Sequence, residues 1–181
     1  YDAKNRLRDA SGLWRESMIH RSGCPINLTI EVLGDRWSVI VLRDMIFGNR
    51  RTYGELLNLS LERIASNILA ARLRHLLAEG LVTVAADPTH KQKKTYSLTE
   101  KAIQLVPLIV HLGAWGVNHT QTSPDLSVRA RLLADGGPAL WAAFMDELRH
   151  LHLGAAPPKV SVLKELDAAY LTASKVIDVD P

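Results

Sequence analysis

Apolar residues recur at helical spacing along most of the chain, and one stretch after Gly80 breaks this pattern. There the segment 81–85 is rich in β-branched residues, and 93–98 can return as a second strand after the turn residues Asp87 and Pro88. Two short strands joined by a turn predict a hairpin. Elsewhere the spacing, with polar starts and glycine stops, predicts helices at 26–33, 36–47, 52–58, 65–79 and 99–119, the last kinked at Pro107.

The composition changes after residue 120, where a Ser-Pro pair precedes a further helical region. Glycine and proline at 136–138 and 154–158 divide this region into three amphipathic helices. We therefore expect a mainly α fold with a small β-hairpin wing, that is, a winged helix-turn-helix plus a C-terminal helical extension. The predicted parts are an N-terminal helical arm at 1–23, a winged helix-turn-helix domain at 24–120 with a dimerisation helix at 99–119, and the extension at 121–181.

The helix predicted at 65–79 has two unlike faces. Leu69, Leu73 and Leu76 form its apolar face, and small or polar residues occupy the other side. Small residues let a helix sink into the DNA major groove, where Asn pairs with adenine and Arg with guanine. A solvated alanine-rich face is the alternative, because alanine is the best helix former. The candidate base-reading residues are Asn67, Ala70, Ala71 and Arg74.

The charge of the chain is unevenly distributed. The net charge is +3, but residues 1–94 carry +5 and residues 95–181 carry −2. The excess gathers on the 65–79 helix and the hairpin tip, which is the footprint of phosphate contacts. A lysine-rich strand edge also protects against aggregation, so that alternative stays open. The candidate phosphate contacts to double-stranded DNA are Arg50, Arg51, Ser66, Lys91, Lys93 and Lys94.

The helix predicted at 99–119 is apolar almost all round, so it cannot bury every face within one small domain. A second copy of the chain is the favoured cover, which predicts a homodimer. Cover by residues 126–176 of the same chain is the alternative. The candidate dimer residues are Leu105, Leu108, Ile109, Leu112 and Trp115.

Composition excludes several classes of protein. The hydrophobic fraction of 47% and the charged fraction of 23% are ordinary for a globular protein. A single cysteine excludes a disulfide scaffold and a multi-cysteine zinc site. The apolar run 105–117 is shorter than the roughly 20 residues of a membrane helix, and the start does not resemble a signal peptide. We expect a cytoplasmic protein without membrane, metal or cofactor, and the missing catalytic motifs indicate that it is not an enzyme.

About ten short motifs stand in the order and spacing of a known family. They are Cys24-Pro25, Gly34-Asp35-Arg36-Trp37, Leu42-Arg43-Asp44, Gly48, Arg50 to Leu56, Ile64, Leu69, Arg72-Leu73, Leu76, Gly80-Leu81, Tyr96 to Glu100 and Trp115-Gly116. Residues 24–118 thereby resemble the HxlR-type winged helix regulators, bacterial transcription factors related in fold to the MarR group. The resemblance implies a homodimer that binds an inverted-repeat operator. The chain departs from the family at Ala102, where glycine is usual, and in a wing without paired prolines.

Two hypotheses concern control of such a regulator. Cys24 precedes a predicted helix, whose N-terminus lowers a thiol pKa, and some relatives sense oxidants with a cysteine at this motif. A buried, inert cysteine is the alternative. Trp37, Trp115, Trp141 and Met145 are candidates to line a small-molecule effector pocket, although aromatics at helical spacing are more often core. The alternative to the whole interpretation is a protein-interaction or ligand-binding module that uses the winged fold without specific DNA binding.

Overall fold

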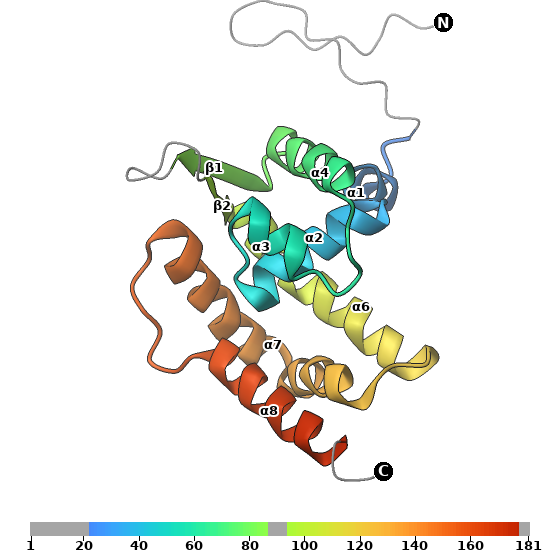
Figure 1. Cartoon of the computed structure of the whole chain (residues 1–181), viewed down its shortest axis with the longest axis vertical. Helices are drawn as coiled ribbons and strands as arrows, with labels where there is room; N and C mark the ends of the chain where they lie inside the picture. Colours follow the sequence, from blue (N-terminus) through green and yellow to red (C-terminus); the bar gives the residue numbers. More distant parts are fainter. Residues whose placement is uncertain (1–21, 87–93, 178–181) are drawn as a thin grey trace, which may run out of the picture. The chain divides into compact units, whose positions relative to one another are not determined.

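The computed structural model describes residues 22–86 and 94–177 (Figure 1). The chain divides into two compact units, Tyr1–Arg36 and Trp37–Pro181. Helix α1, Pro25–Leu33, lies in the first unit and begins after Cys24 with a proline in its first turn. It ends at Gly34, where a Cβ atom would lie 2.2 Å from the carbonyl oxygen of Ile30. This confirms the helix predicted at 26–33.

Three helices form the helix-turn-helix region of the second unit. They are α2 (Arg36–Gly48), α3 (Tyr53–Asn58) and α4 (Ser66–Ala78). Thr52 and Glu55 form a complete capping box at the start of α3, as their spacing predicts. The core between these helices consists of buried aliphatic side chains, namely Val41, Leu42, Met45, Ile46, Leu56, Ile64, Leu69, Leu73 and Leu76.

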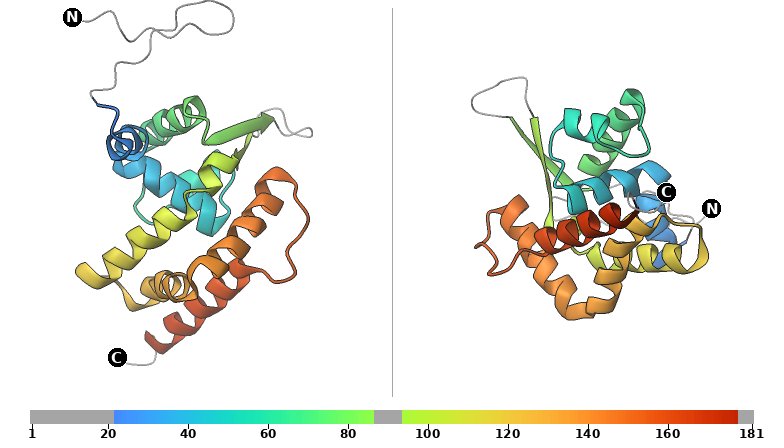
Figure 2. Two further views of the ribbon diagram at one scale, coloured as in Figure 1. Left: turned by 180° about the vertical axis from the view of Figure 1, so that it is seen from behind. Right: turned by 60° about the horizontal axis from the view of Figure 1, so that its bottom comes forward.

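The end of α4 directs the chain into the wing. Gly80 adopts a left-handed conformation, with φ at 66°, while its own N–H and that of Leu81 bond back to Leu77 and Leu76. This pair of bonds is a Schellman motif, which favours glycine at the left-handed position. Strands β1 (Val82–Ala86) and β2 (Lys94–Leu98) follow as an antiparallel pair, with Val82 opposite Leu98. Figure 2 shows this hairpin extending away from the helices of its unit.

The helix predicted at 99–119 is two helices, α5 (Glu100–Ile103) and α6 (Val106–His119). The predicted kink at Pro107 is therefore a full break at residues 104–105. Proline is in the first turn of α6, where its missing N–H costs no hydrogen bond, whereas inside a continuous helix it would clash with the preceding turn. The sequence pattern predicts the position of the interruption correctly, but it predicts a kink in one helix where the structure has two separate helices.

The C-terminal region consists of α7 (Pro124–Leu153) and α8 (Val162–Ile177). Gly137 interrupts α7 with a non-helical conformation, φ 59° and ψ −162°, so α7 is two helices joined at the predicted glycine break. Helices α7 and α8 lie side by side, and α7 also packs against α6 (Figure 1). The ring of Phe144 stacks on Phe47 of α2 with centroids 5.6 Å apart, so the extension shares the core of the winged region. The predicted domain boundary at 120 stays a prediction.

Two negative findings concern residues 22–86 and 94–177. Within these ranges, no helix is both long enough and apolar enough to cross a membrane. In the same described residues, no group of three or more His, Cys, Asp or Glu side chains is arranged to hold a metal ion.

Candidate functional site

Helix α4 presents one buried face and one outward face. Leu69, Leu73 and Leu76 are buried, as the apolar spacing predicts. On the opposite side Asn67 and Arg74 are exposed, whereas Ala70 and Ala71 are half-buried. The Arg74 side chain lies along the helix, and its Nε donates to the Ala70 carbonyl at 3.3 Å. All four predicted base-reading residues thus share one side of α4.

The N-terminus of α4 is open. Its N-cap residue is Ala65, which has no side chain able to accept a hydrogen bond from the first helical turn. Free N–H groups at a helix start attract anions such as phosphate. The Tyr53 hydroxyl donates to the Ser66 carbonyl at 2.8 Å and lies 2.7 Å from the Ser66 hydroxyl. Tyr53 of α3 therefore holds Ser66, the first residue of α4 and a predicted phosphate contact, in position.

Arg63 is an exposed cation that the sequence motifs do not indicate as a DNA contact. It lies in the connector between α3 and α4 with φ at 52°, a left-handed conformation uncommon outside glycine. Its N–H donates to the Ser60 carbonyl at 3.1 Å, which fixes the turn. In the sequence, only the positive charge of residues 1–94 points to this residue.

Arg50 and Arg51, which are predicted to contact phosphate, both have partners within the fold. Nη1 of Arg50 is 2.8 Å from a carboxylate oxygen of Asp44. The Arg51 guanidinium donates to the carbonyls of Tyr96 and Leu151, at 3.2 and 2.7 Å, and to the Ser97 hydroxyl. Burial lowers the pKa of Arg51. The partners of Arg51 lie 45 to 100 residues further along the chain, so local sequence patterns give no signal for them.

The predicted lysines of the wing are only partly described. Lys91 and Lys93 lie outside the described residues. Lys94 begins β2 opposite Ala86, and its side chain is exposed. On β1 every residue after Val82 is exposed, so this part of the hairpin serves as a projecting arm rather than as core.

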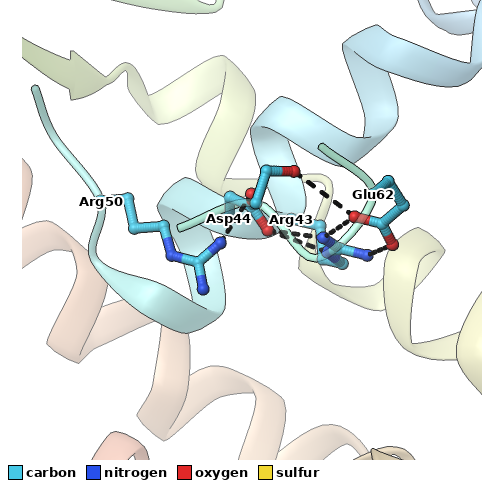
Figure 3. Close-up of polar contacts among 5 residues, drawn as sticks. Arg43, Asp44, Arg50 and Glu62 are labelled. Atoms are coloured by element: carbon cyan, nitrogen blue, oxygen red, sulfur yellow. Dashed lines mark hydrogen bonds and ion pairs between the residues drawn. The ribbon is translucent and has the colours of Figure 1, made fainter. Parts of the chain in front are cut away.

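An ion-pair cluster ties the connector before α4 to α2 (Figure 3). Arg43 binds the Glu62 carboxylate through both terminal nitrogens, at 2.5 and 2.7 Å, and donates from Nε to Asp44 at 3.0 Å. This fork-to-fork geometry is the strong form of an arginine–carboxylate pair. The hydrogen bonds from Arg43 hold the pKa of Glu62 below its usual value. Glu62 thereby anchors the segment that leads into α4.

Helix α6 keeps an apolar stripe on its surface. Leu108, Leu112 and Trp115, spaced i, i+4 and i+7, are 40%, 51% and 60% exposed. The other two predicted dimer residues, Leu105 and Ile109, are half-buried. Helix α7 also packs against α6, so intramolecular cover accounts for some of its apolar surface, and these three side chains stay exposed.

Cys24 is exposed, so the alternative of a buried cysteine is wrong, and its reactivity stays a prediction. Its thiol precedes α1, and the backbone N–H groups of Asn27 and then Ile26 lower its pKa. Among the aromatics considered for a pocket, Trp141 donates to the Leu133 carbonyl at 2.6 Å and packs edge-on against His111. Trp141 is therefore a packing residue of α7.

Comparison with known proteins places this geometry in context. Residues 32–124 match the family model described as HxlR-like helix-turn-helix. The uncharacterized HTH-type transcriptional regulator sll1512 of Synechocystis sp. is 30% identical over 115 residues, covering 64% of this chain and 82% of that protein. The uncharacterized HTH-type transcriptional regulator YdeP of Bacillus subtilis is 33% identical over 94 residues, covering 52% and 72%. The crystal structure of PA1607, described as a candidate transcription factor, is 34% identical with a TM-score of 0.51, covering 56% and 69%.

Proposed function

Because the chain belongs to the HxlR-like helix-turn-helix family, we propose that it is a transcriptional regulator that binds a specific double-stranded DNA sequence. The observation that carries this proposal is the outward face of α4. There Asn67 and Arg74 stand exposed beside two alanines, on a helix whose opposite face is anchored in the core. An amide and a guanidinium are the groups that pair bidentately with adenine and guanine in the major groove.

Phosphate contacts position the helix on the duplex. The uncapped start of α4 at Ser66 offers N–H groups to one phosphate, and the neighbouring Arg63 offers a cation. Lys94, with Lys91 and Lys93, supplies the wing's contacts to the adjacent backbone. Arg50 and Arg51 are left out of this interface because their guanidiniums bind within the fold.

The proposal includes a homodimer and an inverted-repeat operator. The exposed stripe of Leu108, Leu112 and Trp115 supplies a self-complementary apolar surface on α6. Two-fold symmetry then presents two α4 helices to half-sites about one helical turn, roughly 10 base pairs, apart. Such a regulator performs no catalysis and works in the cytoplasm, where bacterial chromosomal DNA is found.

The test is selection of bound sites from a random double-stranded DNA library, followed by a salt titration on the selected site. We expect an inverted repeat to be enriched. The logarithm of affinity should fall linearly with the logarithm of salt concentration, with a slope of about −0.9 for each phosphate contacted. A library without enrichment, or an affinity indifferent to salt, contradicts the proposal and favours an interaction module that does not bind DNA specifically.

A further inference from the structure

A cavity of about 470 Å³ lies between α2, α6 and the first half of α7. This volume falls within the range of small-molecule sites, roughly 300–1,000 Å³. One wall consists of Leu126, Arg129, Ala130 and Leu133 of α7. These residues follow the family match, which ends at residue 124, so the C-terminal extension rather than the common winged core closes the cavity.

Most of the cavity wall is apolar. Val39, Ile40 and Phe47 from α2 face Ile109 and Val110 from α6 across it. Two further lining residues, Leu61 and Leu126, are exposed large hydrophobic side chains, and Leu112, which also lines the cavity, belongs to the apolar stripe of α6. An apolar molecule that binds in the cavity would cover these exposed leucine side chains, and the removal of their apolar surface from water favours binding.

One part of the lining is charged, and its guanidiniums are paired with carboxylates without using all of their N–H donors. The guanidiniums of Arg43, Arg50 and Arg129 line it, against the carboxylates of Asp44 and Glu62. Within the described residues, Arg50 uses only Nη1 for its ion pair with Asp44. In the same part of the chain, Arg129 uses Nε and Nη2, which bind the Leu166 carbonyl and the exposed carboxylate of Asp167. Nitrogen donors therefore remain on both Arg50 and Arg129.

We propose that this cavity binds a small, largely apolar molecule that carries one anionic group, and that this molecule regulates DNA binding. The apolar wall takes the body of the molecule, and the unused N–H donors of the Arg50 and Arg129 guanidiniums take its anion. The regulatory half rests on the function proposed above. The binding half rests on the cavity alone.

The charged lining residues also couple ligand binding in the cavity to the positions of α4 and the wing. The Arg43–Glu62 pair holds the connector into α4, and the Asp44–Arg50 pair holds the residue before Arg51, which bonds to β2. An anion at Arg43 and Arg50 competes with Glu62 and Asp44 for the same guanidiniums. A ligand that binds more tightly to the protein with these ion pairs broken than to the protein with them intact shifts the equilibrium towards the broken state. When these ion pairs are broken, the segment that leads into α4 is no longer held against α2. The position of α4 is then less well defined, so the ligand weakens DNA binding.

The binding test uses two fluorescent probes that share one apolar body. They are 1-anilinonaphthalene-8-sulfonate, which carries an anion, and N-phenyl-1-naphthylamine, which carries none. Titration of the full chain should show one sulfonate probe bound per chain, and at least tenfold weaker binding of the uncharged amine. Equal affinities for the two probes overturn the assignment of an anionic group.

Paired variants on α7 locate the probe. Ala130→Trp fills the cavity and should abolish binding, whereas Ala142→Trp places the same side chain on an exposed position of α7 and should leave binding unchanged. Arg129→Gln should weaken only the sulfonate probe, about tenfold, and the exposed Arg131→Gln should not. Thermal unfolding of each variant checks that it folds. Unchanged binding of the sulfonate probe to folded Ala130→Trp overturns the cavity as its site.

A DNA readout then separates the two proposals. A saturating sulfonate probe should weaken binding to the selected DNA site at least fivefold in the parent chain and not in Ala130→Trp. A chain that binds DNA but not the probe overturns the cavity proposal alone. A chain that binds the probe in the cavity but no DNA overturns the proposed function and leaves the binding half standing.

Discussion

The backbone N–H of Leu98 donates a hydrogen bond to Nδ1 of His152 at 3.2 Å. Leu98 ends strand β2 of the wing, and His152 lies in the last turn of α7. The adjacent Leu151 carbonyl accepts from Arg51, which also binds the carbonyl of Tyr96 in β2. Two consecutive residues of the C-terminal extension therefore fasten the base of the wing.

This contact predicts a loss of stability in mild acid. His152 is 7% exposed, and burial, with a smaller effect of the Arg51 charge, lowers its pKa to about 4. The His152 ring must be neutral in this contact, because only an unprotonated Nδ1 can accept the hydrogen bond from the Leu98 N–H. The unfolded chain takes up a proton near the ordinary histidine pKa, about 6.5, and the folded chain does not until about pH 4. The stability is present above pH 6.5 and is lost as the pH falls towards 4.

Urea unfolding at pH 7.5 and pH 5 measures this effect. We expect the free energy of unfolding to fall by about 2 kcal/mol on account of His152. His152→Gln keeps an acceptor for Leu98 without a titrating ring, so its loss over the same interval should be smaller by that amount. Equal losses in the parent and the variant would contradict the assignment.

How much the sequence predicts depends on how local the determining contacts are. The capping box of Thr52 and Glu55, the stop at Gly80 and the break at Gly137 follow from neighbouring residues, and the structure confirms all three. Arg51 and His152 have partners far along the chain, and composition or spacing contains no signal for such pairs. The outward face of α4 could be predicted from the sequence because the helical period alone determines it. The cavity could not be predicted, because it forms only where three helices meet.

The outward face of α4 predicts different behaviour for Arg74 and Lys94. Arg74→Ala should cost about 1–3 kcal/mol on the selected site and relax the preference for one base pair, because a base contact is lost. Lys94→Ala should weaken binding to selected and random DNA alike and reduce the salt slope by about one phosphate. Competition binding with both DNAs distinguishes the two. Equal losses on selected and random DNA from Arg74→Ala would exclude Arg74 as a base-reading residue.

The apolar stripe on α6 predicts the effect of a charge at the proposed dimer interface. Trp115→Glu places a carboxylate in a surface that must lose water on association, so the dimer should dissociate at least tenfold more readily. The matched control is Leu171→Glu, which is similarly exposed but lies on α8. Sedimentation velocity measures association, and affinity for the inverted repeat should fall in parallel. A monomeric parent chain, or a dimer that Trp115→Glu leaves intact, would count against this interface.

Cys24 is predicted to ionise, and therefore to react, more readily than a free cysteine thiol, because its pKa is lowered. The N–H groups of Ile26 and Asn27 favour the thiolate, and the side chain is exposed. Alkylation by iodoacetamide at pH 7 should therefore be faster than that of a cysteine peptide. If oxidation of this thiol controls the protein, peroxide should release the parent chain from DNA and leave Cys24→Ser bound. Release of both proteins to the same extent would exclude Cys24 as the sensor.

The stack of Phe144 on Phe47 predicts that the extension and the winged region unfold together. Phe144 is fully buried, so Phe144→Ala should destabilise the chain by about 3–5 kcal/mol through lost packing and a cavity. Because its neighbours lie in both α2 and α7, the loss should lower the unfolding midpoint of the whole Trp37–Pro181 unit. Leu171→Ala, at an exposed position of α8, should change stability little. Calorimetry should show one transition before and after Phe144→Ala. Two transitions, of which the substitution shifts only one, would instead support an independent domain at 121–181.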